Sequence, residues 1–158
     1  MQEQREGGAG VRLRALTPQR AVGLWKLFSE PIEHTFERQG VVEGSRAERY
    51  AMGKVEDGEL ELRMIEDGDQ LVGFVIWRVA DDIERLFLVW MLYLYPEHRH
   101  QPEVQLRIYR ELMRLAHRHG CERLAFCGRP GLGRALGGLV DRRASDFYRT
   151  RVFSVEET

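Results

Sequence analysis

Alternating apolar and polar positions predict strands in the first half of the chain. Residues 11–16 alternate apolar and basic side chains, which suits a short, half-buried strand. Residues 59–65 alternate in the same way, and a turn rich in Asp and Gly at 66–69 separates them from residues 70–80, where β-branched and aromatic side chains are frequent. The last two segments therefore predict a β-hairpin.

Apolar residues at helical spacing follow the first strand. Thr17 is suited to cap a helix, and Pro18 to occupy its first position. Apolar residues then recur at helical spacing over 22–28. We expect Pro31 to interrupt this helix, because proline has no backbone N–H, and a second helical piece to cover 31–39.

A third helix is expected at residues 45–55. Ser45 is suited to cap it, and Glu48 three residues later completes a capping box. A turn at 56–58 then leads into the predicted hairpin.

A long apolar run at residues 83–95 predicts the central strand of a sheet. The run is too short for a membrane-spanning helix, and its continuous apolar character is typical of a strand covered on both faces. After a polar turn, an amphipathic helix is expected from Pro102 to Gly120, with Glu103 suited to its positive end. Residues 123–127 form the next expected strand, which should run parallel to the central one.

The order of these elements predicts an α+β (mixed α/β) fold. Its central sheet is expected to be mostly antiparallel, with one parallel pair of strands, and to be flanked by helices. A short glycine-rich helix at 131–140 and a last strand at 147–155 complete the order. At 158 residues the chain is most simply one domain over 10–158, preceded by a polar, glycine-rich tail at 1–9.

The distribution of charge and of possible metal ligands excludes few classes of ligand. Acidic residues prevail before Arg99 and arginines after it, which suits an anionic ligand, although solvated helix surfaces explain the same pattern. The arginine stripe of the 102–120 helix has no interleaved aromatic residues, so nucleic acid is not the expected partner. Cys121 and Cys127 are expected to be reduced thiols, and the clustered histidines do not share a helix face, so no metal site is expected.

The end of the central strand carries a family pattern. An apolar-apolar-x-Pro-x-x-Arg motif is formed by Leu92, Tyr93, Leu94, Tyr95, Pro96 and Arg99. With the order of elements, this motif resembles the GNAT superfamily of N-acyltransferases, as topology over 11–155 and as sequence mainly over 86–116. The resemblance implies that the strand holds the pantetheine arm of acetyl-CoA through backbone contacts of Tyr93 and Leu94.

The turn after this strand corresponds to the family's pyrophosphate loop but departs from its pattern. The resemblance assigns cofactor contacts in this loop to Arg99, His100, Gln101 and Val104. Pro102 and Val104 stand where the family has small residues, and Pro102 removes a backbone donor. Glu103 adds a negative charge near a doubly charged ligand. The loop is therefore degenerate with respect to the family.

Acyl transfer from a thioester to an amine needs a base and an acid that protonates the departing thiolate. One register of the resemblance aligns Ala144 and Tyr148 with the family's late Ala-x-x-x-Tyr pattern and makes Tyr148 the catalytic acid. A rival register makes 131–140 the late helix and Tyr148 a packing residue of the last strand. No base is identified, and Glu84 is a candidate only by its position on the central strand.

Two functions follow from the resemblance. The first is a cytoplasmic enzyme that transfers an acyl group from acetyl-CoA to an amine, without a metal. The second is a catalytically inactive binding or assembly module, which the degenerate loop favours. Diverged GNAT-like proteins occur in phage genomes, so this alternative places the chain in a virion, within a homo-oligomer or a larger assembly. Neither function involves a membrane.

Overall fold

The computed structural model describes residues 10–40, 42–81, 84–127, 144–147 and 150–154. The strands within these ranges are β1 (Val11–Ala15), β2 (Glu61–Asp67), β3 (Gln70–Asp81), β4 (Arg85–Leu94), β5 (Arg123–Cys127), β6 (Ala144–Phe147) and β7 (Thr150–Ser154). The helices are α2 (Pro18–Gly23), α3 (Lys26–Gln39), α4 (Gly44–Glu56), the 3₁₀ helix η1 (Pro96–His98) and α5 (Pro102–Arg118).

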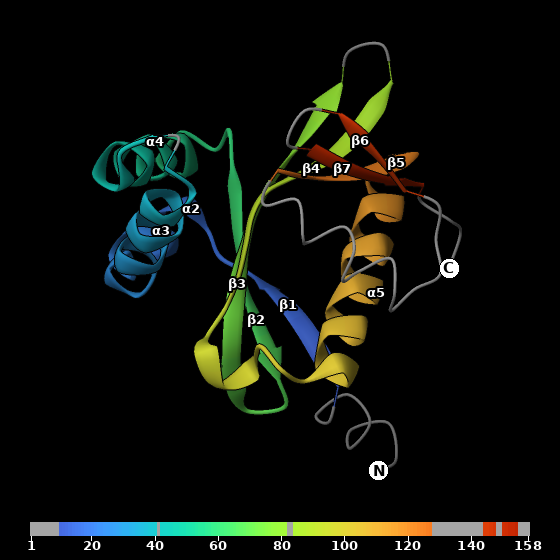
Figure 1. Cartoon of the computed structure of the whole chain (residues 1–158), viewed down its shortest axis with the longest axis horizontal. Helices are drawn as coiled ribbons and strands as arrows, with labels where there is room; N and C mark the ends of the chain where they lie inside the picture. The colour runs from blue at the N-terminus through green and yellow to red at the C-terminus, as the bar shows by residue number, and fades with distance from the viewer. Residues whose placement is uncertain (1–9, 41, 82–83, 128–143, 148–149, 155–158) are drawn as a thin grey trace.

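The described strands form one mixed sheet, in the order β1-β2-β3-β4-β5-β7-β6. All neighbouring pairs are antiparallel except β4 and β5, which are parallel. Helices α2, α3 and α4 lie on one side of the sheet and α5 on the other (Figure 1). This confirms the predicted fold class, the parallel strand–helix–strand unit and the central position of β4.

Two apolar cores lie on opposite sides of the sheet. The core under α5 includes Phe87 and Val89 of β4 together with Leu112 of the helix, all of them buried. The core under α2–α4 includes Phe28 of α3 and Met91 of β4. Strand β4 therefore contributes to both cores, as the continuous apolar run predicted.

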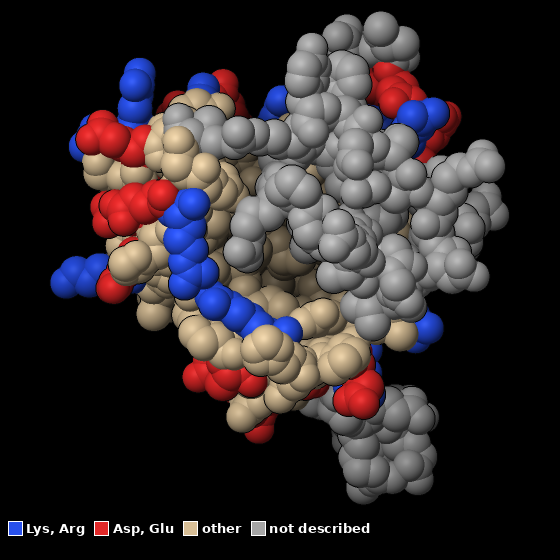
Figure 2. Space-filling model, in the orientation of Figure 1, with Lys and Arg blue, Asp and Glu red and all other residues tan. Residues whose placement is uncertain are grey.

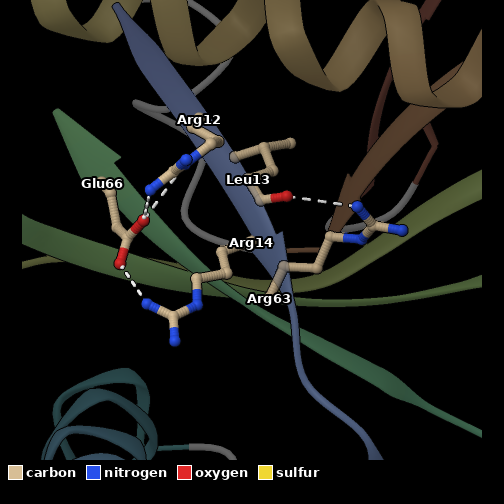
Figure 3. A network of polar contacts seen from close by, with 5 residues as sticks. All are labelled: Arg12, Leu13, Arg14, Arg63 and Glu66. Atoms are coloured by element: carbon tan, nitrogen blue, oxygen red, sulfur yellow. Dashed lines mark hydrogen bonds and ion pairs between the residues drawn. The ribbon is translucent and has the colours of Figure 1, made fainter. Parts of the chain in front are cut away.

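A polar network ties the edge strand β1 to β2 (Figure 3). Arg12 and Arg14 both donate to the Glu66 carboxylate, with N–O distances of 2.8 and 3.1 Å. From β2, Arg63 donates to the backbone carbonyl of Leu13 at 3.2 Å. The predicted strand at 11–16 and the predicted hairpin are both confirmed.

The predicted helix interruption at Pro31 is wrong. The break lies earlier, between α2 and α3, and α3 runs without interruption through Pro31. The missing N–H of Pro31 leaves the carbonyl of Leu27, four residues earlier, without its helical donor. The hydroxyl of Tyr95, the residue after β4, approaches that carbonyl at 3.5 Å and replaces part of what the helix loses.

Of the two predicted helix N-caps, Thr17 is confirmed and Ser45 is wrong. Thr17 caps α2 as predicted, because its hydroxyl accepts from the Arg20 N–H at 3.2 Å. Ser45 does not cap α4: the helix begins at Gly44, and its N-cap makes no side-chain hydrogen bond. Glu48, the second half of the predicted capping box, instead accepts the indole N–H of Trp25 and joins α4 to the start of α3.

The late elements are partly confirmed. Strand β5 has the predicted bounds, and β7 lies within the predicted last strand. Strand β6, at 144–147, was not predicted. The expected tail at 1–9, the expected helix at 131–140 and Tyr148 lie outside the described residues. In the described part of the chain, no helix has the length and apolar character that crossing a membrane requires.

Candidate functional site

Strands β4 and β5 form an open wedge at the centre of the sheet. Their parallel pairing covers Leu86 to Val89 of β4 and ends at the pair of Val89 with Phe126. Beyond this point, residues 91–94 of β4 pair with β3 alone among the residues that the structure describes. The space-filling view shows a hollow in the surface between the positions that Figure 1 gives to β4 and α5 (Figure 2). We take the unpaired edge of β4 and this hollow as the candidate site.

A β-bulge at Trp90 marks the point where the wedge opens. Val89 pairs with Trp77 and Met91 with Ile76, so Trp90 has no counterpart in β3. As a result Trp90 and Met91, although adjacent, both pack on the α2–α4 side, whereas Val89 packs on the α5 side. Such a bulge bends a strand and re-aims its side chains, which accounts for the divergence of β4 from β5.

Backbone groups of alternate β4 residues point into the wedge. The Tyr95 N–H donates to the Val72 carbonyl of β3 at 2.9 Å. The Tyr93 carbonyl also faces β3, where it lies against Gly73. Because backbone groups alternate in direction along a strand, Leu92 and Leu94 face the wedge. Of the two residues predicted to make backbone contacts, Leu94 has its carbonyl towards the wedge and Tyr93 has its carbonyl towards β3.

Arg99 lies at the exit of the wedge. Its Nε donates to the Leu94 carbonyl at 2.8 Å, and its guanidinium lies 5.1 Å from the ring centroid of Tyr93. Tyr93 in turn stacks on Phe74, with 5.4 Å between ring centroids. Among the described residues, the terminal guanidinium nitrogens of Arg99 have no hydrogen-bond partner. They are the donors that a bound anion would meet.

The turn between β4 and α5 is tied by its own side chains. His98 is buried, and its Nδ1 lies 3.3 Å from Oε1 of Gln101. The Gln105 side chain donates to the Arg99 carbonyl. The predicted loop residues His100 and Gln101 are both exposed. These contacts fix the path of the turn and hold the start of α5 next to Arg99.

The first turn of α5 offers few hydrogen-bond donors to an anion. Pro102 at its start has no N–H, and the exposed Glu103 puts a carboxylate in the first turn. The side chain of Val104 is buried in the α5-side core and points away from any ligand above the turn. What remains for an anion is the backbone N–H groups of Glu103 and Val104 and the side chain of Arg99.

Other candidates do not join the wedge. Glu84 precedes β4, at the end opposite to the bulge, and its carboxylate lies 3.5 Å from Nε of Arg123. Burial raises the pKa of the Tyr95 hydroxyl, which keeps it neutral beside the Leu27 carbonyl. Across the residues that the structure describes, no three His, Cys, Asp or Glu side chains gather to hold a metal ion.

The sequence did not reveal Trp90 and Leu92 as site residues. Both lie inside one unbroken apolar run, and a bulge in such a run leaves the pattern of polar and apolar residues unchanged. The only sequence signal nearby is the motif from Leu92 to Arg99, which locates the end of the strand and not the bulge.

Comparison with known proteins finds similarity only at the level of structure. No protein-family model and no curated protein sequence matches the chain. Among solved structures, ribosomal-protein-alanine N-acetyltransferase from Brucella melitensis biovar Abortus is 20% identical, with a TM-score of 0.62 over 87% of this chain and 95% of that one. A GCN5-related N-acetyltransferase from Ralstonia eutropha is 14% identical, with a TM-score of 0.61 over 87% and 95% of the two chains.

A third similar structure contains a ligand. It is a predicted acetyltransferase with acetyl-CoA from Clostridium acetobutylicum, 13% identical, with a TM-score of 0.62 over 87% of this chain and 93% of that one. At these identities the likeness concerns the fold. The chain has the fold of the GNAT acetyltransferases along nearly the full length of each of the three.

Proposed function

We propose that this protein is an N-acyltransferase that transfers an acyl group from acetyl-CoA to an amine. The observation that carries the proposal is the wedge between β4 and β5, opened by the bulge at Trp90. It offers an unpaired strand edge to an extended ligand that has amide groups of its own. The pantetheine arm of acetyl-CoA is such a ligand, and amides binding along a strand edge form the hydrogen bonds of an added strand.

The residues at the wedge fit the pantetheine arm of acetyl-CoA better than they fit its pyrophosphate. The backbone groups of Leu92 and Leu94 fit the pantetheine amides, although Arg99 already occupies the Leu94 carbonyl. For the pyrophosphate, the donors are the Arg99 guanidinium and the first N–H groups of α5. Pro102 removes one donor, and a hydrogen bond to a charged group contributes about 1.5–3 kcal/mol. The Glu103 carboxylate also opposes an anion at this helix end. The proposal therefore includes weak binding of the cofactor.

The chemistry of the proposal is attack of an amine on a thioester carbonyl. Acetyl-CoA supplies that thioester when it is bound. The bulge places backbone groups of β4 at the point where the wedge opens, where they would orient the carbonyl for attack. Tyr148 remains the proposed acid for the departing thiolate, and the base remains unassigned.

A second candidate function is a catalytically inactive GNAT-fold module that binds another protein, as a homo-oligomer or in a larger assembly such as a virion. The specific observation in its favour is the first turn of α5, where Pro102 and Glu103 oppose phosphate binding. This alternative predicts a defined oligomer in solution and no binding of acetyl-CoA. Location in the cytoplasm accompanies the first function and location in a virion the second.

Titration of the purified chain with acetyl-CoA, by calorimetry and by thermal shift, separates the two functions. Under the first function, millimolar acetyl-CoA raises the melting temperature. Arg99→Ala then weakens binding by about 10- to 100-fold, because a hydrogen bond to a charged group contributes roughly 1.5–3 kcal/mol. Arg110→Ala is the matched control, since Arg110 is an exposed arginine farther along α5. No thermal shift at millimolar acetyl-CoA would refute the enzyme.

A further inference from the structure

The side chain of Arg99 is held by two neutral groups at the end of β4. Its Nε donates to the Leu94 carbonyl at 2.8 Å, and its guanidinium carbon lies over the Tyr93 ring, 5.1 Å from the ring centroid. A guanidinium over the face of a tyrosine ring is attracted by the partial negative charge of that face. Two consecutive residues of β4 thus hold this long side chain against the end of the strand.

These neutral contacts leave the charge of Arg99 available to a ligand. Arg85, at the other end of β4, shows the contrast, because its guanidinium is paired with the Asp81 carboxylate at 2.6 Å. Within the described part of the chain, Arg99 forms no ion pair, and it is half-buried. An anion that reaches the turn therefore meets a positive charge that no described carboxylate neutralises, and charge-assisted hydrogen bonds are the strong ones.

The Tyr93 ring is itself positioned by the core. It stacks on the ring of Phe74, with 5.4 Å between centroids, and the Tyr95 ring meets it edge-on at 5.5 Å. Phe74 is completely buried and contacts the Phe28 ring of α3 at 5.0 Å. A row of aromatic contacts thus leads from the core under α2–α4 to the guanidinium, so the place of the Tyr93 ring is set by buried neighbours.

The backbone of Arg99 is fixed as well. Its N–H donates to the Pro96 carbonyl at 3.3 Å, and its carbonyl accepts from the Gln105 side chain of α5. The carbonyl oxygen, which would repel an anion, is therefore engaged by an amide. With the main chain held on both sides, the direction of the guanidinium depends on the side-chain rotamers of Arg99, and the contact with Tyr93 restricts these rotamers.

We propose that Tyr93 is a positioning residue, whose ring holds the Arg99 guanidinium ready for the pyrophosphate of acetyl-CoA before the cofactor binds. This inference rests on the proposed acyltransferase function and adds to it a role for the Tyr93 side chain. The contact exists in the free protein, so its contribution to binding is the ordering of Arg99 that binding no longer requires. Ordering one such side chain costs about 0.5–1.5 kcal/mol, which corresponds to about 2- to 10-fold in affinity.

A double-mutant cycle on the binding of acetyl-CoA tests the inference. Calorimetry, with ligand-observed NMR for weakly binding variants, gives Kd for the wild type, Tyr93→Phe, Tyr93→Leu, Arg99→Ala and the double variant Tyr93→Leu/Arg99→Ala. Tyr93→Leu should weaken binding by about 2- to 10-fold, whereas Tyr93→Phe keeps the ring and should bind like the wild type. In the Arg99→Ala background, Tyr93→Leu should have no further effect, because no guanidinium remains to be held.

The cycle separates a positioning role from a merely structural one. A structural role of Tyr93 would weaken binding by the same factor with and without Arg99, so additive losses overturn the inference. An unchanged Kd in Tyr93→Leu overturns it too, as do equal losses in Tyr93→Phe and Tyr93→Leu, which would assign the effect to the hydroxyl. A wild-type protein that does not bind acetyl-CoA refutes the acyltransferase function itself, and the inference with it.

A second replacement keeps the test decisive where Tyr93→Leu does not fold. Tyr93→pentafluorophenylalanine preserves an aromatic ring that packs against Phe74, but fluorine withdraws the negative charge from the ring face that attracts the guanidinium. Its affinity for acetyl-CoA should be about 2- to 10-fold lower than that of Tyr93→Phe, and equal affinities overturn the inference. Urea unfolding of each variant checks that the fold is retained.

Discussion

Gly73 of β3 is the position where the sheet beside the wedge is most sensitive to a single added carbon. A Cβ at this position would lie 2.0 Å from the Tyr93 carbonyl oxygen and 3.0 Å from the Leu94 Cα. The first distance is about 1.5 Å shorter than the roughly 3.5 Å at which carbon atoms make favourable contacts. The nearest atoms all belong to the β4 backbone, so no side-chain rotation relieves the clash.

Gly73→Ala must therefore move β3 away from β4 at the strand end that carries Leu94 and Arg99. Overpacking in a core costs about 1–3 kcal/mol, and a clash with backbone atoms, which cannot rotate away, places this variant at the upper end, near 3 kcal/mol. For a chain of this length that corresponds to a melting temperature lower by about 6–12 °C. Because β4 carries the wedge, we also expect weaker binding of acetyl-CoA.

Gly53→Ala is the matched control. Gly53 lies within α4, and a Cβ there would meet no atom within 4 Å. Alanine is favoured over glycine inside a helix by about 0.5–1 kcal/mol, so this variant should be slightly more stable than the wild type. Replacing glycine by alanine is thus expected to lower stability at position 73 and to raise it at position 53.

Urea unfolding followed by far-UV circular dichroism measures both effects, with the slope of the transition as a check that the unfolded state is unchanged. The expected order of midpoints is Gly53→Ala above wild type and Gly73→Ala well below it. A Gly73→Ala midpoint equal to that of the wild type would refute the close approach of β3 to β4. Equal losses in the two variants would show that glycine loss alone, and not the strand contact, sets the effect.

Three further predictions concern the stability of the helices and strands around the candidate site. Burial alone would raise the pKa of Glu66, but hydrogen bonds from Arg12 and Arg14 of β1 outweigh it and hold the pKa below the ordinary value of a glutamate. The stabilisation is present above that ordinary value and is lost as the pH falls through the lowered one, so Glu66→Gln should flatten the decline of the urea midpoint in acid. Thr17→Ala removes the α2 cap and should lower the free energy of unfolding by about 1 kcal/mol, whereas Thr17→Ser should not. Tyr95→Phe leaves the Leu27 carbonyl without its hydroxyl donor and should cost no more than about 1 kcal/mol by chemical denaturation, because that contact is long; a larger loss would mean that the hydroxyl is a principal anchor of α3.

The elements that the sequence predicted well are those in which local chemistry and tertiary packing agree. The turn at Gly68, with a φ of 62°, needs a residue that tolerates left-handed backbone, and glycine supplies it. Gly120, with a φ of 71°, closes α5 in the same way. At such positions the conformation depends on one residue and its neighbours, so the sequence is sufficient.

The wrong predictions concern positions where the conformation depends on a side chain that is distant in the sequence. Proline usually breaks a helix, yet α3 continues through Pro31, with the carbonyl of Leu27 near the hydroxyl of Tyr95, which directly follows β4. Glu48 has a capping residue's spacing, yet its carboxylate accepts the indole N–H of Trp25. Neither partner is close in sequence, so no local pattern contains the information. The bulge at Trp90 is a stronger case, because it depends on the register of two strands.

Architecture and cofactor chemistry of the wedge have separate physical origins in this chain. The wedge depends on the bulge in β4 and on the buried side chains that hold β4 between two cores. From the first turn of α5, Val104 belongs to one of these cores, whereas the exposed Pro102 and Glu103 do not. Under the proposed function, phosphate affinity depends on Arg99, Pro102 and Glu103, which are exposed or half-buried. It follows that a GNAT fold is compatible with any cofactor affinity at this loop. Replacing Pro102 and Glu103 by Gly and Gln should therefore raise the affinity for acetyl-CoA by restoring one donor and removing one charge, while the free energy of unfolding changes by no more than about 1 kcal/mol.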